Sequence, residues 1–153
     1  MVRSRGFTLI ELSIALAVLA VLVTMAVPSL KLRAQREKEV ELHAALRDIR
    51  GALDAYKRAA QEGRIKLPAD ASGYPASLET LVEGVPDASR SDAGRLFFLR
   101  RVPRDPMLGE GVSGWGLRSY ASSAESPSAG ADVFDVYSLS SGVGLNGVAY
   151  REW

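Results

Sequence analysis

The chain opens with the stretch Arg5-Gly6-Phe7-Thr8-Leu9-Ile10-Glu11-Leu12, which leads into an apolar run that continues to Leu30. From Leu12 to Leu30 nineteen consecutive residues carry no charge, and a helix needs about 20 apolar residues to cross a membrane. A secretory signal peptide is the alternative, but its apolar core spans roughly 7–15 residues and ends at a small-x-small cleavage site. No such site stands at the end of the run, which reads Val27-Pro28-Ser29-Leu30. The run therefore favours a membrane-spanning helix over a secretory signal.

Glu11 is a carboxylate one turn inside this apolar segment. A charged side chain in a membrane costs a few kcal/mol, so it is a functional candidate that needs a partner. The alternative is that Glu11 lies in the lipid headgroup zone, as part of the first turn of the span. The carboxylate alone does not decide between the two interpretations.

The residues around Glu11 resemble the cleavage and methylation motif of type IV pilins and type II secretion pseudopilins. The resemblance implies that a prepilin peptidase cuts after Gly6 and that Phe7 becomes the N-methylated first residue of the mature chain. It makes Glu11 the fifth mature residue, and Pro28 falls where this family places a proline in its long helix.

The same resemblance suggests how subunits align in a filament. Cleavage creates an α-amine at Phe7, which is one candidate partner for Glu11 of a neighbouring subunit. A desolvated ion pair adds little net stability, but leaving one of its charges unpaired is costly. We therefore expect Glu11 to select the register of assembly more than to strengthen it.

The resemblance also sets the expected domains and location. It implies a cytoplasmic leader at residues 1–6, a helix at 7–30 in the inner membrane or filament core, and a periplasmic domain at 31–153. The positive-inside rule alone predicts the opposite orientation in the membrane. Two basic residues, Arg3 and Arg5, precede the span, whereas four follow it closely: Lys31, Arg33, Arg36 and Lys38. The orientation therefore follows the processing motif, and the expected partners are the peptidase, identical and related pseudopilins, and the inner-membrane assembly platform.

The rest of the chain predicts an α+β fold in which a long N-terminal helix packs on a small antiparallel sheet, as in pilins. Residues 32–62 have helical composition, and Gly63 is a stop signal. Their apolar stripe has helical spacing and should pack on the chain's own domain, a filament seam being the alternative: Leu42, Leu46, Ile49, Leu53, Tyr56 and Ala60. We expect a short helix at 75–84 with Ser77 as N-cap, a polar loop at 85–94, and strands at 115–121, 133–139 and 148–153.

Three later segments resemble pseudopilins of the major type more than pilus subunits. They are Val102-Pro103-Arg104-Asp105-Pro106, Trp115-Gly116-Leu117 and Asp135-Val136-Tyr137-Ser138-Leu139. The chain has no Cys, whereas many type IV pilins close their C-terminal loop with a disulfide. A subunit of a secretion pseudopilus is the preferred interpretation, and a type IV or competence pilus subunit is the alternative.

The final loop departs from the family pattern at the calcium site that major pseudopilins often carry. Calcium takes six to eight oxygen ligands, usually with several carboxylates. The loop reads Ser140-Ser141-Gly142-Val143-Gly144-Leu145-Asn146-Gly147 and contains no Asp. Ser140 and Asn146 are weak candidate ligands, and we expect neither calcium nor another cofactor.

Composition argues against other classes of function. Without Cys and with His43 as the single His, a metal centre or a Ser-His-Asp triad is not expected. No nucleophile elbow or phosphate-binding loop occurs, so we do not expect an enzyme. The formal net charge is only +1, which gives no support for nucleic-acid binding through the five candidate basic residues Arg95, Arg100, Arg101, Arg104 and Arg118.

Overall fold

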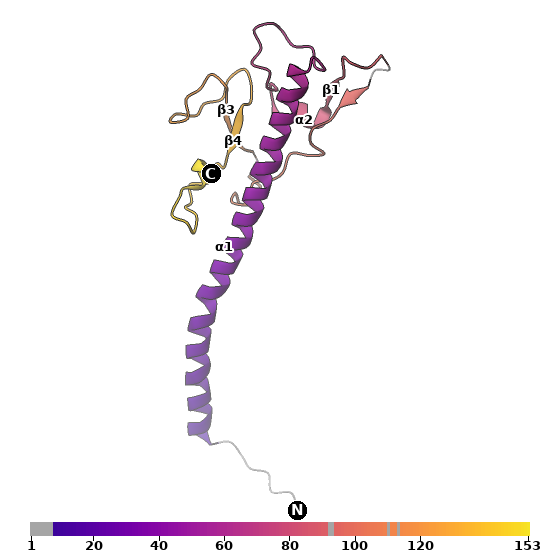
Figure 1. Cartoon of the computed structure of the whole chain (residues 1–153). Helices are drawn as coiled ribbons and strands as arrows, with labels where there is room; N and C mark the ends of the chain where they lie inside the picture. The colour runs from indigo at the N-terminus through magenta and orange to yellow at the C-terminus, as the bar shows by residue number, and fades with distance from the viewer. Residues whose placement is uncertain (1–7, 92–93, 110, 113) are drawn as a thin grey trace, which may run out of the picture. The chain divides into compact units, whose positions relative to one another are not determined.

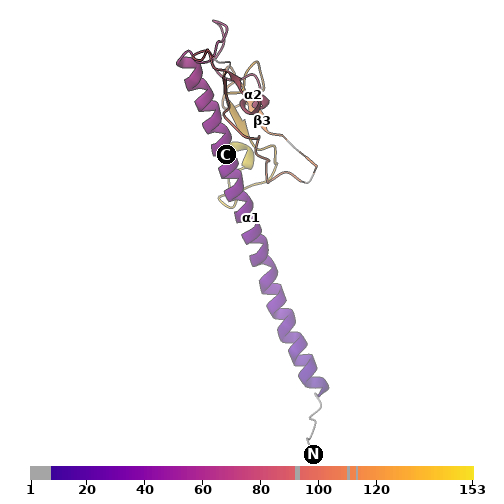
Figure 2. The same ribbon diagram turned by 90° about the vertical axis from the view of Figure 1, so that its right-hand side faces the viewer.

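The computed structural model describes residues 8–91, 94–109, 111–112 and 114–153, without the side chains of 25–29. Contacts divide the chain into two compact units, Met1–Glu37 and Lys38–Trp153. One helix, α1 (Leu9–Gln61), contributes residues to both units (Figure 1). In the second unit the other elements lie on one side of α1 (Figure 2).

The helix α1 continues through position 28, as predicted, although proline removes a backbone donor there. It ends at Gln61, and Gly63 adopts a left-handed φ of 73°. The Gly63 N–H donates to the Ala60 carbonyl (3.0 Å), and the Arg64 N–H donates to the Ala59 carbonyl (2.9 Å). These two bonds form a Schellman motif, which satisfies carbonyls that the helix end would otherwise leave unpaired.

The predicted stripe on α1 forms the core of the second unit. Five of its six members are buried, while Ala60 is half-buried and its neighbour Ala59 takes the buried place. The stripe packs against apolar residues from every later part of the chain, among them Leu81, Trp115, Val133, Val136 and Tyr150. The structure therefore confirms that this stripe serves the chain's own fold.

The helix α2 (Leu78–Glu83) confirms the predicted short helix, with Ser77 as N-cap and Gly84 after its end. The Ser77 hydroxyl lies 3.3 Å from the Thr80 hydroxyl rather than capping a backbone N–H. Gly84 is required at this turn, because a Cβ there would lie 2.7 Å from the Leu96 carbonyl oxygen and its φ is +73°.

The prediction of a polar loop at 85–94 was wrong at its start. Strand β1 (Val85–Pro86) pairs antiparallel with strand β2 (Arg95–Leu96) to form a hairpin. Paired segments of only two residues are too short to show the alternation that identifies strands.

A buried carboxylate holds this hairpin together. Asp87 accepts hydrogen bonds from Arg64 Nη2 (2.6 Å), from the Ser89 hydroxyl (2.6 Å) and from the Ser89 N–H (3.0 Å). The Ala88 N–H donates to the Arg64 carbonyl over 2.8 Å. The bond from Arg64 first, and those from Ser89, hold the pKa of the Asp87 carboxyl well below its usual range.

The second sheet confirms two of the predicted strands. Strand β3 (Gly116–Arg118) pairs antiparallel with β4 (Asp135–Tyr137), and Gly116 lies opposite Tyr137. A Cβ on Gly116 would lie 2.2 Å from the Tyr137 ring, so only glycine fits.

The strand predicted at 148–153 is instead a 3₁₀ helix, η1 (Tyr150–Glu152). The Gly144 N–H donates to the Val148 carbonyl (2.8 Å) and the Tyr150 N–H to the Gly142 carbonyl (3.1 Å). Val143 and Ala149 thereby form an isolated antiparallel bridge instead of the predicted strand.

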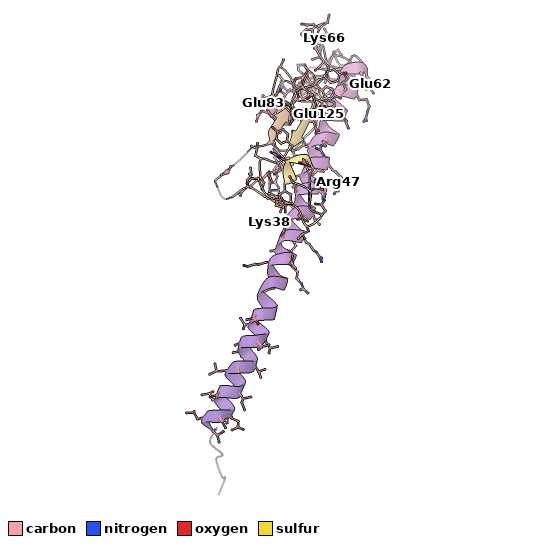
Figure 3. The ribbon with its side chains drawn as sticks, turned by 90° about the vertical axis from the view of Figure 1, so that its left-hand side faces the viewer. Lys38, Arg47, Glu62, Lys66, Glu83 and Glu125 are labelled. Carbon is pink, nitrogen blue, oxygen red and sulfur yellow. The ribbon has the colours of Figure 1, made fainter. Side chains whose placement is uncertain are left out.

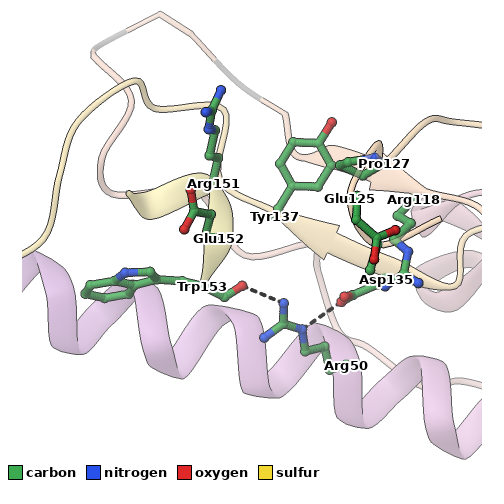
Figure 4. A pocket seen from close by; sticks show the side chains of 10 residues that line it. Arg50, Arg118, Glu125, Pro127, Asp135, Tyr137, Arg151, Glu152 and Trp153 are labelled. Atoms are coloured by element: carbon green, nitrogen blue, oxygen red, sulfur yellow. Dashed lines mark hydrogen bonds and ion pairs between the residues drawn. The ribbon is translucent and has the colours of Figure 1, made fainter. Parts of the chain in front are cut away.

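Arg50 ties α1 to the second sheet and to the end of the chain (Figure 4). Its Nε donates to Asp135 Oδ1 (2.7 Å), and its Nη2 donates to the carbonyl oxygens of Val136 (3.0 Å) and Trp153 (2.7 Å). A guanidinium presents several donors in a fixed plane, which suits this joint contact. Arg50 thereby holds β4 and η1 beside the same turn of the helix.

The Asp87 cluster predicts a pH-dependent stability. Because the pKa of Asp87 is lowered on folding, its contribution is present above about pH 4 and is lost as the pH falls through the folded-state pKa. Asp87→Asn should therefore lower the free energy of unfolding at neutral pH, and its difference from the wild type should shrink below about pH 4. Urea denaturation followed by circular dichroism at several pH values measures this. The exposed Asp70→Asn is the control, and a constant difference for Asp87→Asn at all pH values would contradict the assignment.

Candidate functional site

The N-terminus of α1 forms a capping box. The Thr8 hydroxyl accepts the Glu11 N–H (3.3 Å), while Glu11 Oε2 accepts both the Thr8 N–H and the Thr8 hydroxyl (3.2 Å each). This reciprocal pairing satisfies two backbone donors that a helix start leaves unpaired. A carboxylate is also favourable in the first turn, because of the helix dipole. Thr8 was not among the predicted site residues, although its spacing to Glu11 is a recognised signal.

The other predicted processing and assembly residues are placed only in part. Gly6 and Phe7 lie outside the described residues. The contact expected between the Phe7 amine and Glu11 joins neighbouring subunits, so the structure of one chain does not test it. Glu11 itself is exposed and engages only Thr8 in the described contacts. Position 28 is helical, and its side chain is not among those described. The register role of Glu11 and the role of Pro28 therefore stay predictions.

The first part of α1 presents a large exposed apolar surface. All ten of its large apolar side chains between Leu9 and Val23 are exposed, by 52% to 86%. In Figure 3 the side chains along this part of the helix point outward. The hydroxyls of Ser13 and Thr24 donate hydrogen bonds to the carbonyls of Leu9 (2.9 Å) and Val21 (2.7 Å) in the preceding turn. They therefore add little polarity to this surface. Contiguous apolar surface of this kind marks a site of interaction with a protein or a membrane.

Among the described residues, no helix is both long enough and apolar enough to qualify as a membrane span. The membrane-spanning role expected for residues 7–30 therefore stays a prediction. The basic run that follows is exposed at Lys31, Arg33, Arg36 and Lys38.

The two candidate calcium ligands both form hydrogen bonds within the final loop. The Ser140 hydroxyl accepts the Gly142 N–H (3.2 Å), and Asn146 Oδ1 accepts the Val148 N–H (3.0 Å). Both side-chain oxygens therefore bond to their own loop. No group of three or more His, Cys, Asp or Glu residues in the described part of the chain could hold a metal ion.

His43 packs on the end of the chain rather than standing alone on the surface. Its ring stacks on Trp153 with centroids 4.3 Å apart and planes at 15°. Trp153 also contacts Tyr150 edge-on, at 5.1 Å. His43 is otherwise exposed.

Three of the five candidate basic residues have contacts within the domain. Arg95 Nη2 donates to the carbonyls of Glu83 (3.1 Å) and Gly84 (2.7 Å). Arg104 Nη2 donates to the Gly109 carbonyl (3.0 Å), and Arg118 lies 5.0 Å from the centre of the Phe134 ring. These contacts have structural roles in the domain, and Arg100 and Arg101 remain exposed.

A hollow of about 740 Å³ lies beside Arg50 (Figure 4). Its charged lining balances three guanidinium groups against three carboxylates, which belong to Arg50, Arg118, Arg151, Glu125, Asp135 and Glu152. The lining contains no Ser, Cys, His or Lys, and Tyr137 supplies its one hydroxyl.

The three later segments that carry the family resemblance meet around one buried carboxylate. Asp105 is almost fully buried and accepts the Ser138 hydroxyl (2.6 Å) and the Met107 N–H (2.8 Å). The Trp115 indole N–H donates to the Pro103 carbonyl (2.9 Å). A buried carboxylate needs such donors, because leaving it unpaired would be costly. The three segments that resemble the family therefore contact one another within the domain.

Comparisons with known proteins identify a family match and several relatives. The family model described as "Prokaryotic N-terminal methylation motif" matches residues 1–27. The type II secretion system core protein G of Klebsiella pneumoniae is 35% identical over an alignment of 113 residues, which covers 69% of this chain and 71% of the relative. The protein of that name from Klebsiella michiganensis is 31% identical over 69% of this chain and 70% of the relative.

A third relative of that name, from Pectobacterium carotovorum, is 31% identical over 68% of this chain and 62% of its own length. No solved structure matches the chain significantly. The motif at the N-terminus and the matches over two thirds of the chain point to one group of proteins. The chain belongs to the pseudopilin family of the type II secretion system core protein G.

Proposed function

We propose that this chain is the structural, non-enzymatic subunit of a type II secretion pseudopilus, a filament that polymerises through the first part of α1 to drive protein export. The observation that carries the proposal is the apolar surface between Leu9 and Val23, in which every large apolar side chain is exposed. A helix with apolar residues on all sides is stable only inside a protein assembly or a membrane. The relatives' name supplies the assembly, a type II secretion system.

The processing step follows from the match at residues 1–27. A prepilin peptidase cuts after Gly6, and Phe7 becomes the methylated N-terminus. Before assembly, residues 7–30 anchor the subunit in the bacterial inner membrane with the leader in the cytoplasm and residues 31–153 in the periplasm. The inner-membrane assembly platform then transfers the subunit into the filament, where identical and related pseudopilins surround it.

The capping box gives Glu11 two successive partners in this scheme. In the free subunit, Thr8 supplies the donors that satisfy the carboxylate. In the filament, the Phe7 amine of a neighbouring subunit adds an opposite charge. The capping box keeps the carboxylate at the first turn of α1, so Glu11 presents its charge at a fixed height in the filament. A subunit that adds out of step leaves this charge unpaired, which is costly in an apolar surrounding.

Replacing the residue before the scissile bond tests processing. We expect Gly6→Ala to leave an uncleaved precursor in the membrane and to abolish filaments, because the cleavage motif that this chain resembles has glycine at this place. Mass spectrometry of the purified subunit reads the N-terminus directly. Gly51→Ala is the control, because a Cβ at this helical glycine meets nothing within 4 Å. A Gly6→Ala chain that begins at methylated Phe7 and assembles normally would refute the processing scheme.

Removing only the charge of Glu11 tests the register role. Glu11→Gln keeps an acceptor for Thr8, so we expect normal cleavage and a normal helix start. Incorporation into filaments should fall at least about tenfold, because the unpaired amine of the neighbour then lies in an apolar surrounding. Quantifying the subunit in filaments sheared from cells measures this, with the exposed Glu41→Gln as the matched control. Incorporation of Glu11→Gln at the wild-type level would show that the charge has no role in register.

A further inference from the structure

Glu39, a half-buried residue of α1, contacts two groups far along the chain. Its carboxylate Oε1 accepts the Leu145 N–H and the Tyr150 hydroxyl, each over 2.9 Å. These donors lie 106 and 111 residues away in sequence. We propose that the Glu39 carboxylate fastens the final loop to α1 and orders this loop without a bound cation.

The loop's own hydrogen bonds support an anion rather than a cation at this place. Three of its backbone carbonyls, those of Gly142, Gly144 and Val148, accept N–H groups of the same segment. Its side-chain oxygens, those of Ser140 and Asn146, do the same. Toward α1 the loop presents donors, the Leu145 N–H and the Tyr150 hydroxyl. A carboxylate complements such donors, whereas calcium requires six to eight oxygens.

Tyr150 links the Glu39 contact to Trp153 at the end of the chain. Its side chain is buried, and its ring contacts Trp153, which stacks in turn on His43 of α1. The loop approaches these rings closely: a Cβ on Gly144 would lie 2.4 Å from Trp153 and one on Gly142 would lie 3.0 Å from Tyr150. The Glu39 contact therefore sets the position of the whole segment from the loop to η1.

The Leu145 amide is a direct probe of this contact. Leu145 is exposed, so the protection of its N–H from exchange with solvent depends on the bond to Glu39. A hydrogen bond to a charged group contributes about 1.5–3 kcal/mol, so its loss corresponds to roughly tenfold to hundredfold faster exchange.

Hydrogen exchange of the full-length chain in detergent tests the proposal. We expect Glu39→Ala to accelerate exchange at Leu145 by at least about tenfold and leave the Val136 amide of β4 unchanged. Tyr150→Phe removes the second donor and should give a smaller acceleration. Glu41→Ala, on an exposed neighbour of the same helix, should have no effect.

The cation arm of the experiment uses the same readout. In the wild type, a chelator should leave the exchange of Leu145 unchanged, and added calcium should not restore protection in Glu39→Ala. Wild-type protection of Leu145 in Glu39→Ala would overturn the proposal, as would faster exchange of the wild type in chelator. Both outcomes are independent of filament assembly, so they separate this inference from the proposed function.

Discussion

The helix α1 carries two apolar surfaces, and only one of them is covered by the chain itself. The stripe from Leu42 to Tyr56 is buried by residues of every later element. The surface from Leu9 to Val23 is exposed throughout. Burying apolar area is the main favourable term in folding and association, so the first surface stabilises the domain and the second requires surroundings outside the chain. The rest of the structure depends on this division of one helix into a folding part and an assembling part.

A domain with so little regular sheet needs other means to hold its loops, and polar side chains supply them. The strands have only two or three residues each. Three contacts fix the intervening segments: Asp87 with Arg64, Asp105 with Ser138, and Arg50 with Asp135. Asp87 and Asp105 are buried, so leaving either carboxylate unpaired would cost more than its contact contributes. Arg50 and Asp135 are partly exposed and form a direct ion pair. Glu39 adds a fourth tie, at the final loop.

Features with a local signal were predictable from the sequence. The spacing of the α1 stripe, the stop at Gly63, and the position of the short helix between Ser77 and Gly84 depend on neighbours within a few residues. The structure confirms these positions. The polar loop at 85–94 and the strand at 148–153 were wrong, because a two-residue strand and a 3₁₀ turn have no periodicity to detect. In the site, the Thr8–Glu11 capping box was readable from its spacing and was overlooked. The Glu39 contact was not predictable, since its partners lie more than a hundred residues away.

Placing a charge on the exposed apolar surface tests the central claim most directly. A lysine near the middle of a membrane-embedded helix costs about 2.5–3.5 kcal/mol, and Leu16 lies within the surface at 59% exposure. The measurement is the amount of Leu16→Lys subunit in filaments sheared from cells, with Val112→Lys, on an exposed residue of the domain, as control. Our account predicts that Leu16→Lys is reduced roughly a hundredfold while Val112→Lys assembles like the wild type. Wild-type amounts of Leu16→Lys in filaments would contradict it.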